Sequence, residues 1–190
     1  MSYPWDKRVD FVVRHMYDID NNGSLDNNDF ACMALRATVV EGKGKVTPEN
    51  LASYKKVMDN LWKEISDLAD FDKDGKITTD EFKQAVQTSC VGKKYAEFPQ
   101  AMKAFIDAYY KTVDVDGDNC VSRDEYRYSC ITRIAVDDIK VVDDAFDQLL
   151  NDDDKKRGGI SLQRFQELYA SFLGDLNDKN SAITLFGPVQ

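Results

Sequence analysis

The sequence predicts an all-α protein in which four helix–loop–helix units form two pairs, and the pairs pack into one compact globule. Three observations lead to this prediction. A twelve-residue acidic segment occurs at 18–29, 70–81 and 114–125, and a degenerate fourth copy follows at 153–164. Apolar residues recur at three- and four-residue spacing beside these segments, which is the period of an amphipathic helix. The chain has 190 residues, 43% of them hydrophobic, and can therefore bury a core without disulfide support.

The segment 70–81 is the most regular copy and reads D-x-D-x-D-G, followed after five residues by glutamate. This is the pattern of the calcium loop of an EF-hand. Calcium takes six to eight oxygen ligands, and such a loop supplies them from positions 1, 3, 5, 7, 9 and 12. The ligands predicted here are Asp70, Asp72, Asp74, the backbone carbonyl of Lys76, Thr78 directly or through a water, and Glu81. The alternative is a solvated aspartate-rich turn, which would not require every position to be filled.

The first copy, at 18–29, closes with an aspartate in place of glutamate. Its predicted ligands are Asp18, Asp20, Asn22, the Ser24 carbonyl, Asp26 and Asp29. Aspartate is one methylene shorter than glutamate, so it reaches the ion with both oxygens less easily. A single oxygen favours six-coordination, which suits magnesium better than calcium. We therefore expect magnesium to compete with calcium at this loop.

The third copy, at 114–125, has Asn119 where the first two copies have glycine. Asparagine is among the non-glycine residues that best tolerate a positive φ. We expect the loop to form with a strain of about 1 kcal/mol. Its predicted ligands are Asp114, Asp116, Asp118, the Cys120 carbonyl, Ser122 as an optional ligand, and Glu125.

The fourth copy, at 153–164, has cations at three of its ligand positions, namely Lys155, Arg157 and Arg164. It cannot hold calcium by the same mechanism. The acidic run at 151–154 leaves a weak out-of-register site as the minor alternative.

Loops of this kind pair through a short antiparallel contact at their apolar eighth residues. We predict that Leu25 faces Ile77 and that Val121 faces Ile160. Because an isolated two-stranded contact needs its partner, the fourth loop has a structural role, which is to hold the third loop in shape.

Apolar stripes predict the helices that flank the loops. Thr47 and Pro48 are the N-cap and first residue of a long helix over 48–69, and Asp137 is the predicted cap of a later helix. The long stripe could form a coiled-coil seam, but it covers under three heptads and is interpreted as core. In chain order the stripes are Trp5, Val9, Val12, Val13 and Met16; Phe30, Met33, Ala34 and Ala37; Leu51, Tyr54, Met58, Leu61, Ile65 and Leu68; Phe82, Ala85 and Val86; Met102, Phe105, Ile106 and Tyr109; Tyr126, Cys130 and Ile134; and Val141, Val142, Ala145, Phe146 and Leu149.

Glycine, proline and a loss of periodicity around 92–99 predict a boundary between two halves. Residues 1–92 would form an N-terminal pair with both loops active. Residues 93–174 would form a C-terminal pair whose third loop is active and whose fourth is degenerate. Residues 175–190 form an unusually apolar tail that we expect to pack on the body, with disorder as the alternative.

The composition restricts the partners and the compartment. With 34 acidic and 25 basic residues and a formal charge of −9, nucleic acid and anionic membranes are poor candidates as partners. The first residues lack an apolar leader, and no apolar run approaches the roughly 20 residues needed to cross a bilayer. The default prediction is a soluble cytoplasmic protein. The cysteines lack zinc-type spacing and are expected to be reduced; they are Cys32, Cys90, Cys120 and Cys130.

Three intact loops, a degenerate fourth and a strongly acidic chain resemble the invertebrate sarcoplasmic calcium-binding proteins, most closely the arthropod members. The supporting stretches lie at 3–9, 16–23, 68–71 and 185–188. The Asp29 closure is similar to that of arthropod members, whereas Asn119 departs from the family pattern. The resemblance implies a soluble calcium and magnesium buffer of muscle cytoplasm, with no dedicated protein target. It also implies that a homodimer is a candidate assembly, and that some crustacean relatives are food allergens.

A calcium sensor and a coelenterazine photoprotein are the two alternatives to the buffer. A calcium sensor would expose a methionine-rich groove, but this chain has five methionines and an apolar tail that could fill such a cleft. A coelenterazine photoprotein has a similar length and loop count, but its cavity is lined with several histidines. The single histidine here, His15, cannot furnish such a cavity or a catalytic triad, so no enzyme is predicted.

Overall fold

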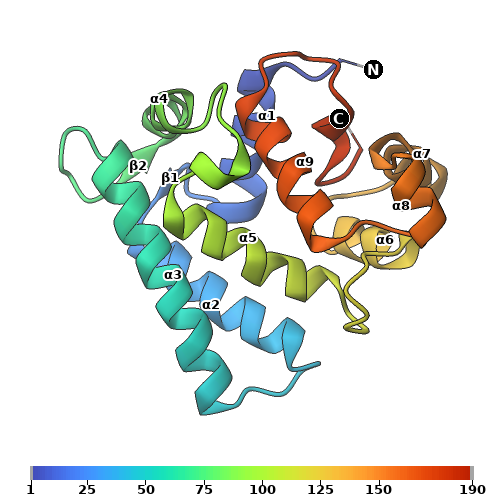
Figure 1. Ribbon diagram of the computed structural model, residues 1–190. Helices are drawn as coiled ribbons and strands as arrows, with labels where there is room; N and C mark the ends of the chain where they lie inside the picture. Colours follow the sequence, from blue (N-terminus) through green and yellow to red (C-terminus); the bar gives the residue numbers. More distant parts are fainter. Residues whose placement is uncertain (1, 189–190) are drawn as a thin grey trace.

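Helices and short loops alternate along residues 2–188, the part of the chain that the computed structural model describes. The fold is helical, as predicted, with one two-stranded sheet (Figure 1). The N-terminal elements are α1 (Trp5–Val12), the π-helical turn η1 (Val13–Tyr17), β1 (Ser24–Leu25), α2 (Asn27–Glu41), α3 (Pro48–Ala69), β2 (Ile77–Thr78) and α4 (Thr79–Ser89). The remaining elements are η2 (Tyr95–Glu97), α5 (Gln100–Val113), α6 (Arg123–Ile131), α7 (Ile139–Leu149), α8 (Asp152–Arg157), α9 (Leu162–Gly174) and η3 (Ser181–Thr184).

The loops pair as the sequence predicts. In the N-terminal half β1 and β2 are antiparallel, and Leu25 is paired with Ile77. In the C-terminal half an isolated bridge joins Val121 to Ile160, whose N–H groups and carbonyls exchange hydrogen bonds of 2.9 and 3.0 Å. All four side chains are buried, so each contact joins its two loops through the core.

The long helix α3 begins and ends at the predicted residues. The Thr47 hydroxyl accepts a hydrogen bond from the Asn50 N–H at 3.2 Å, and Pro48 occupies the first helical turn. The prediction was wrong for Leu68, which is 39% exposed. Leu68 lines an open recess between α3 and the start of α5.

The C-terminal half holds two further corrections. Ile134 is buried, but it follows the end of α6 and lies in the next turn, where its N–H donates to the Cys130 carbonyl. The cap of α7 is Asp138 and not Asp137, because the Asp138 backbone is extended and its carboxylate accepts from the Lys140 N–H at 2.9 Å. Val141 belongs to the predicted apolar stripe of α7 but is exposed.

The turn η1 is a feature that helical periodicity does not reveal. The Asp18 N–H donates to the Val13 carbonyl five residues earlier, at 2.8 Å. This wider turn keeps Met16 and Tyr17 buried on the same side as Val13. It also brings the chain into the first acidic loop directly from the core.

The two halves share one core. The Tyr17 ring contacts Phe82 of α4 and Phe105 of α5, with centroids 5.7 and 5.2 Å apart. Helix α5 packs against α3 on one side and α9 on the other (Figure 1). The Gly92 N–H donates to the Gly174 carbonyl at 2.9 Å, which connects the predicted boundary region to the end of α9.

The segment that follows α9 folds back over the C-terminal half. The side chains from Ala182 to Phe186 are buried. The Thr184 hydroxyl donates to the Ala145 carbonyl at 2.9 Å, and the Tyr126 hydroxyl donates to the Thr184 carbonyl. The last part of the predicted tail, 189–190, lies outside the described residues.

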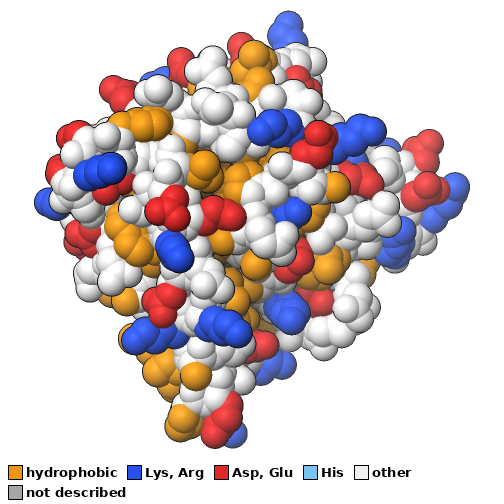
Figure 2. Space-filling view, turned by 60° about the vertical axis from the view of Figure 1, so that its left-hand side comes forward, with side chains coloured by type: hydrophobic (Ala, Val, Ile, Leu, Met, Phe, Trp, Pro, Cys, Tyr) orange, Lys and Arg blue, Asp and Glu red, His pale blue; other side chains and the backbone are white. Residues whose placement is uncertain are grey.

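Apolar side chains are visible in the furrows between helices on the face shown in Figure 2, with acidic and basic side chains interspersed around them. Within residues 2–188, no helix combines the length and the apolar character that a membrane span requires.

Candidate metal centres

The acidic loops each turn sharply through residues with positive φ. At the sixth position these are Gly23, Gly75 and Asn119, with φ of 90°, 81° and 65°. Asn119 therefore adopts the left-handed conformation expected from the sequence. The turns aim several N–H groups inward, and nearby carboxylates accept them. For example, the Gly23 N–H donates to Asp18 at 2.9 Å and the Asn119 N–H donates to Asp114 at 3.0 Å.

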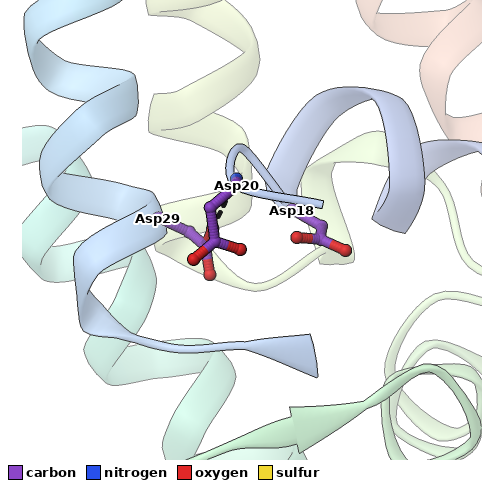
Figure 3. A group of neighbouring side chains, drawn as sticks. All are labelled: Asp18, Asp20 and Asp29. Atoms are coloured by element: carbon purple, nitrogen blue, oxygen red, sulfur yellow. Dashed lines mark hydrogen bonds between the residues drawn. The ribbon is translucent and has the colours of Figure 1, made fainter. Parts of the chain in front are cut away.

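In the first loop the carboxylates of Asp18, Asp20 and Asp29 converge. One oxygen from each lies within 4.8 Å of the others. Figure 3 shows Asp29, at the start of α2, beside Asp20, with Asp18 across from them at the end of η1. Asp18 and Asp29 are 6% and 1% exposed. Both are therefore largely removed from water, and within residues 2–188 neither forms an ion pair with a basic side chain.

The closing Asp29 has both oxygens engaged by the backbone. Its Oδ1 accepts from the Ile19 N–H and its Oδ2 accepts from the Asp26 N–H, each at 2.9 Å. Burial nevertheless raises the pKa of Asp29, against the lowering effect of these hydrogen bonds, and the charge of Asp20 raises it further. A cation in this loop would relieve the same electrostatic cost.

In the second loop Asp70, Asp72 and Glu81 converge within 4.8 Å. The Oδ1 atom of Asp70 is buried and has no hydrogen-bond partner among the described residues. A buried carboxylate oxygen without a donor is costly, and a bound cation would satisfy it. Asp74 lies outside this group, and its carboxylate accepts from the Lys76 N–H at 2.8 Å.

In the third loop the group consists of Asp114, Asp116 and Asp118. Glu125 lies outside it. Its Oε1 accepts from the Val115 N–H at 2.7 Å, and its Oε2 accepts from the Ser122 N–H at 2.8 Å. Glu125 is buried, and its Oε1 also accepts from the N–H of Asp116, a member of the group, at 3.2 Å.

The ninth residues have a role that the ligand pattern alone does not show. Asp26, Thr78 and Ser122 are the N-caps of α2, α4 and α6, and each forms a capping box with the closing residue. Hydrogen bonds from Thr78 lower the pKa of Glu81. The cap therefore fixes the twelfth residue where the exiting helix begins.

The seventh residues make the same backbone contact in all three loops. At the seventh residue the N–H donates to the side chain of the fifth residue, at 3.0 Å in the first loop and 2.8 Å in the other two. This bond fixes the peptide group that precedes Ser24, Lys76 and Cys120, just before each loop enters its strand contact. The Asn22 amide nitrogen donates to Asp20 at 2.9 Å, and its amide oxygen accepts from the Ser24 N–H at 3.0 Å and from the Ser24 hydroxyl at 2.9 Å.

The fourth loop is built differently. Helix α8 replaces the ligand-bearing half of the loop, and Asn151 caps it by accepting from the Asp153 and Asp154 N–H groups. Asp154 is buried, and its oxygens lie 3.2 Å from Arg164 Nε and 3.4 Å from Arg157 Nη1. Among residues 2–188 the acidic run at 151–154 forms no group of three converging carboxylates.

The donor set of the first three loops fits a hard divalent cation. It consists of carboxylate, amide, hydroxyl and carbonyl oxygens, which are the ligands of calcium and magnesium, and it contains no thiolate or imidazole. Cys120 contributes to its loop through its backbone, since its thiol lies against Gly159 of the fourth loop.

Paired helix–loop–helix units with acidic loops define the EF-hand class. In agreement, the model of the EF-hand domain pair matches residues 62–131, which hold the second and third loops. The beta chain of the sarcoplasmic calcium-binding protein from Penaeus sp. is 57% identical, over 100% of this chain and 98% of its own. The chain belongs to the sarcoplasmic calcium-binding protein family.

Solved structures agree on the fold. The sarcoplasmic calcium-binding protein from amphioxus has a TM-score of 0.81 at 23% identity, with 98% of this chain and 97% of that chain covered. The calcium-regulated photoprotein mitrocomin from the jellyfish Mitrocoma cellularia has a TM-score of 0.61 at 17% identity, with 97% and 92% covered. At these identities the similarity establishes a shared fold alone.

Proposed function

We propose that the chain is a calcium buffer of muscle that binds calcium at its first three loops and not at its fourth. The observation that carries the proposal is the contrast between the loops. Within residues 2–188, the converging carboxylates of three loops form no ion pair with a basic side chain, whereas arginines pair with the Asp154 carboxylate of the fourth. The proposed ligands are the eighteen predicted residues at positions 1, 3, 5, 7, 9 and 12 of the first three loops.

The charge of the chain suits this function. Each of the three loops carries four candidate ligand carboxylates, and their mutual repulsion opposes folding in the absence of a cation. Three divalent ions would bring the formal charge from −9 to −3. A bound ion supplies positive charge and oxygen coordination, while the chain holds the oxygens together through its turns, caps and strand contacts. The protein is not an enzyme, since its relatives belong to a non-catalytic class.

At the first loop we propose that magnesium competes with calcium. The closing residue is the shorter aspartate, and both of its oxygens are held by backbone N–H groups. This arrangement supports one-oxygen coordination and a six-coordinate ion. The other two active loops close with glutamate and are expected to prefer calcium more strongly.

A buffer is favoured over a sensor by the position of the tail. Phe186 packs among aromatic rings of α5 and α9, and no partner helix is needed to cover that part of the core. A dye that fluoresces on apolar surfaces separates the two functions. If the protein is a buffer, the refolded chain should bind little dye in calcium and little in chelator. A large calcium-dependent increase in dye fluorescence would indicate a sensor that opens a groove.

The finer organisation remains part of the proposal. We divide the chain into an N-terminal pair (1–92), a C-terminal pair (93–174) and a docked tail (175–190). We also propose that it acts in the cytoplasm of muscle without a dedicated protein target, and that it can form a homodimer. Light scattering coupled to size exclusion, with calcium and with chelator, would measure the assembly directly, and a mass of one chain in both conditions would exclude the dimer.

A further inference from the structure

A cavity of about 150 Å³ lies between the two halves, and its lining residues include no carboxylate. Its walls come from η1, α2 and α3 on one side and from α5 and α6 on the other, and α2 and α5 lie side by side there (Figure 1). The walls are mainly apolar and include Met16, Met33, Met58, Tyr54 and Phe105. An apolar cavity of this size accepts a ring about the size of benzene.

The cavity continues into a polar recess of about 310 Å³, with which it shares His15, Ile19, Arg36, Thr132 and Arg133. The recess also contains Arg14, so three arginines and the single histidine of the chain meet at this opening. Such a concentration of basic groups is unexpected in a protein with a formal charge of −9. Among the residues that line the recess, Asp18 is the sole carboxylate.

The three arginines at this opening differ in their partners from four of the other five; the fifth, Arg8, donates to backbone carbonyls of α9 and Asp175. Within residues 2–188, four arginines elsewhere form ion pairs with carboxylates: Arg123, Arg127, Arg157 and Arg164. Within the same range, no ion pair with a carboxylate is formed by Arg14, Arg36 or Arg133. Among the described residues, no carboxylate lies within ion-pair distance of these three arginines, although Asp18 lines the same recess.

Arg133 is held in place but is not satisfied. Its Nε donates to the Ser129 carbonyl at 2.9 Å and its Nη2 lies 3.0 Å from the Ser129 hydroxyl. Its guanidinium lies over the rings of Tyr109 and Phe186, at 5.5 and 5.8 Å from their centroids. Its Nη1 is buried and has no hydrogen-bond partner among the described residues. A buried guanidinium donor without an acceptor costs free energy.

We propose that this cavity binds a small amphipathic carboxylate, whose apolar ring or short chain fills the space among the methionines while its carboxylate faces Arg36 and Arg133. A largely apolar pocket with a few convergent polar groups is the usual form of a small-molecule site. The planar guanidinium group is suited to a carboxylate, which it can bind through two parallel hydrogen bonds. The apolar cavity is lined by none of the proposed calcium ligands, and the recess at its opening by one of them, Asp18, so the site represents a second binding activity that adjoins the first loop.

The test is a calorimetric titration of the full chain with 3-phenylpropionate, in calcium and in chelator because Asp18 lines the recess. The neutral 3-phenylpropanamide and the cationic 3-phenylpropylamine are controls of matched size. We expect one site with a dissociation constant on the order of 0.1–1 mM for the carboxylate, and binding at least tenfold weaker for the amine. The ring signals of His15, the single histidine, should shift in the NMR spectrum as the carboxylate binds.

Three variants locate the site. Arg36→Gln removes a charge at the opening and should weaken binding of the carboxylate about tenfold, with little effect on the neutral amide. Ala108→Leu fills the cavity and should weaken both ligands. Arg157→Gln, on α8 and outside the cavity, should change neither. A calcium titration of each variant verifies its fold. The proposal is overturned if the carboxylate does not bind in either condition, if the amine binds equally well, or if Ala108→Leu binds the carboxylate as the unsubstituted chain does.

Discussion

Asp154 and Arg164 form an ion pair inside the fourth loop, with Asp154 Oδ2 3.2 Å from Arg164 Nε. Asp154 is 1% exposed, and Arg164 occupies the twelfth position of the loop, where the active loops have a carboxylate. The same side chain also donates to the Leu149 carbonyl at 3.3 Å. An internal cation thus takes the place of a metal ion in this loop, and it does so from the position that would otherwise close the metal site.

Replacing Arg164 with alanine should therefore destabilise the C-terminal half. The change leaves the buried Asp154 carboxylate without its main counter-charge, which should lower the free energy of unfolding by about 2–3 kcal/mol. Because the Val121–Ile160 bridge ties the two loops together, calcium affinity at the third loop should fall as well. Urea unfolding and a calcium titration measure both effects.

The matched control is Arg157→Ala, which removes a longer and more exposed contact to the same carboxylate. It should cost less than about 1 kcal/mol. Equal effects of the two substitutions would show that the Asp154–Arg164 pair has no special role.

The closing residue of the first loop should determine its ion preference. With Asp29→Glu, a second carboxylate oxygen can reach the ion, so calcium affinity measured in millimolar magnesium should rise relative to the unsubstituted chain. Glu81→Asp is the reciprocal control, and it should make the second loop sensitive to magnesium. Competition that is unchanged in Asp29→Glu would contradict the proposed magnesium occupancy.

The third loop should tolerate Asn119 because asparagine adopts its φ of 65° at low cost. Asn119→Ala should lower the free energy of unfolding in calcium by about 1 kcal/mol, since alanine is strained in the left-handed region. Asn119→Gly should lie within about 0.5 kcal/mol of the unsubstituted chain, because relief of strain is offset by greater freedom in the unfolded state. Chemical denaturation separates these outcomes, and an alanine variant as stable as the glycine variant would be inconsistent with the strain.

Phe186 should be a major contributor to stability although it lies close to the end of the chain. Its ring is buried and lies 5.1 Å from the Phe172 ring and 6.0 Å from the Tyr109 ring, centroid to centroid. Phe186→Ala should cost about 3–4 kcal/mol and increase binding of an apolar dye. Leu176→Ala is the control, since Leu176 is 55% exposed and its truncation should cost less than about 0.5 kcal/mol. Similar unfolding midpoints for the two variants would contradict docking of the tail.

Local patterns in the sequence predicted much of the fold. The bounds of α3 follow from Thr47, Pro48 and a continuous apolar stripe, which are all local signals. The pairing of Leu25 with Ile77 follows from their equivalent positions in two copies of one motif. The turn at Asn119 follows from the conformational preference of a single residue type.

Contacts between distant segments were not predictable in this way. Arg8 is fully buried, and its guanidinium donates to the carbonyls of Phe172 and Asp175 at 2.6 Å, which caps the end of α9 from the other end of the chain. Glu64 of α3 accepts from the Ala101 N–H at 2.6 Å and so caps α5, which begins after a proline without a cap of its own. Neither residue has a neighbour in sequence that indicates its partner.

The candidate sites show the same division. The residue types and spacing of the loops were sufficient to identify the carboxylates that converge, because those residues belong to one short turn. The positions of Asp74 and Glu125 outside these groups were not foreseen, since they depend on hydrogen bonds with loop N–H groups. The positive charge of Arg164 was sufficient to predict that the fourth loop does not hold calcium. Its ion pair with the buried Asp154 could not be predicted from the sequence.

The central claim is that three loops bind calcium and the fourth does not. The most direct test is isothermal titration calorimetry of the metal-free chain with calcium, carried out once without magnesium and once in millimolar magnesium. The account predicts three bound ions, with the heat or affinity of at least one site changed by magnesium. Four bound ions would contradict the structural role assigned to the fourth loop, and two would show that the loop containing Asn119 does not hold an ion.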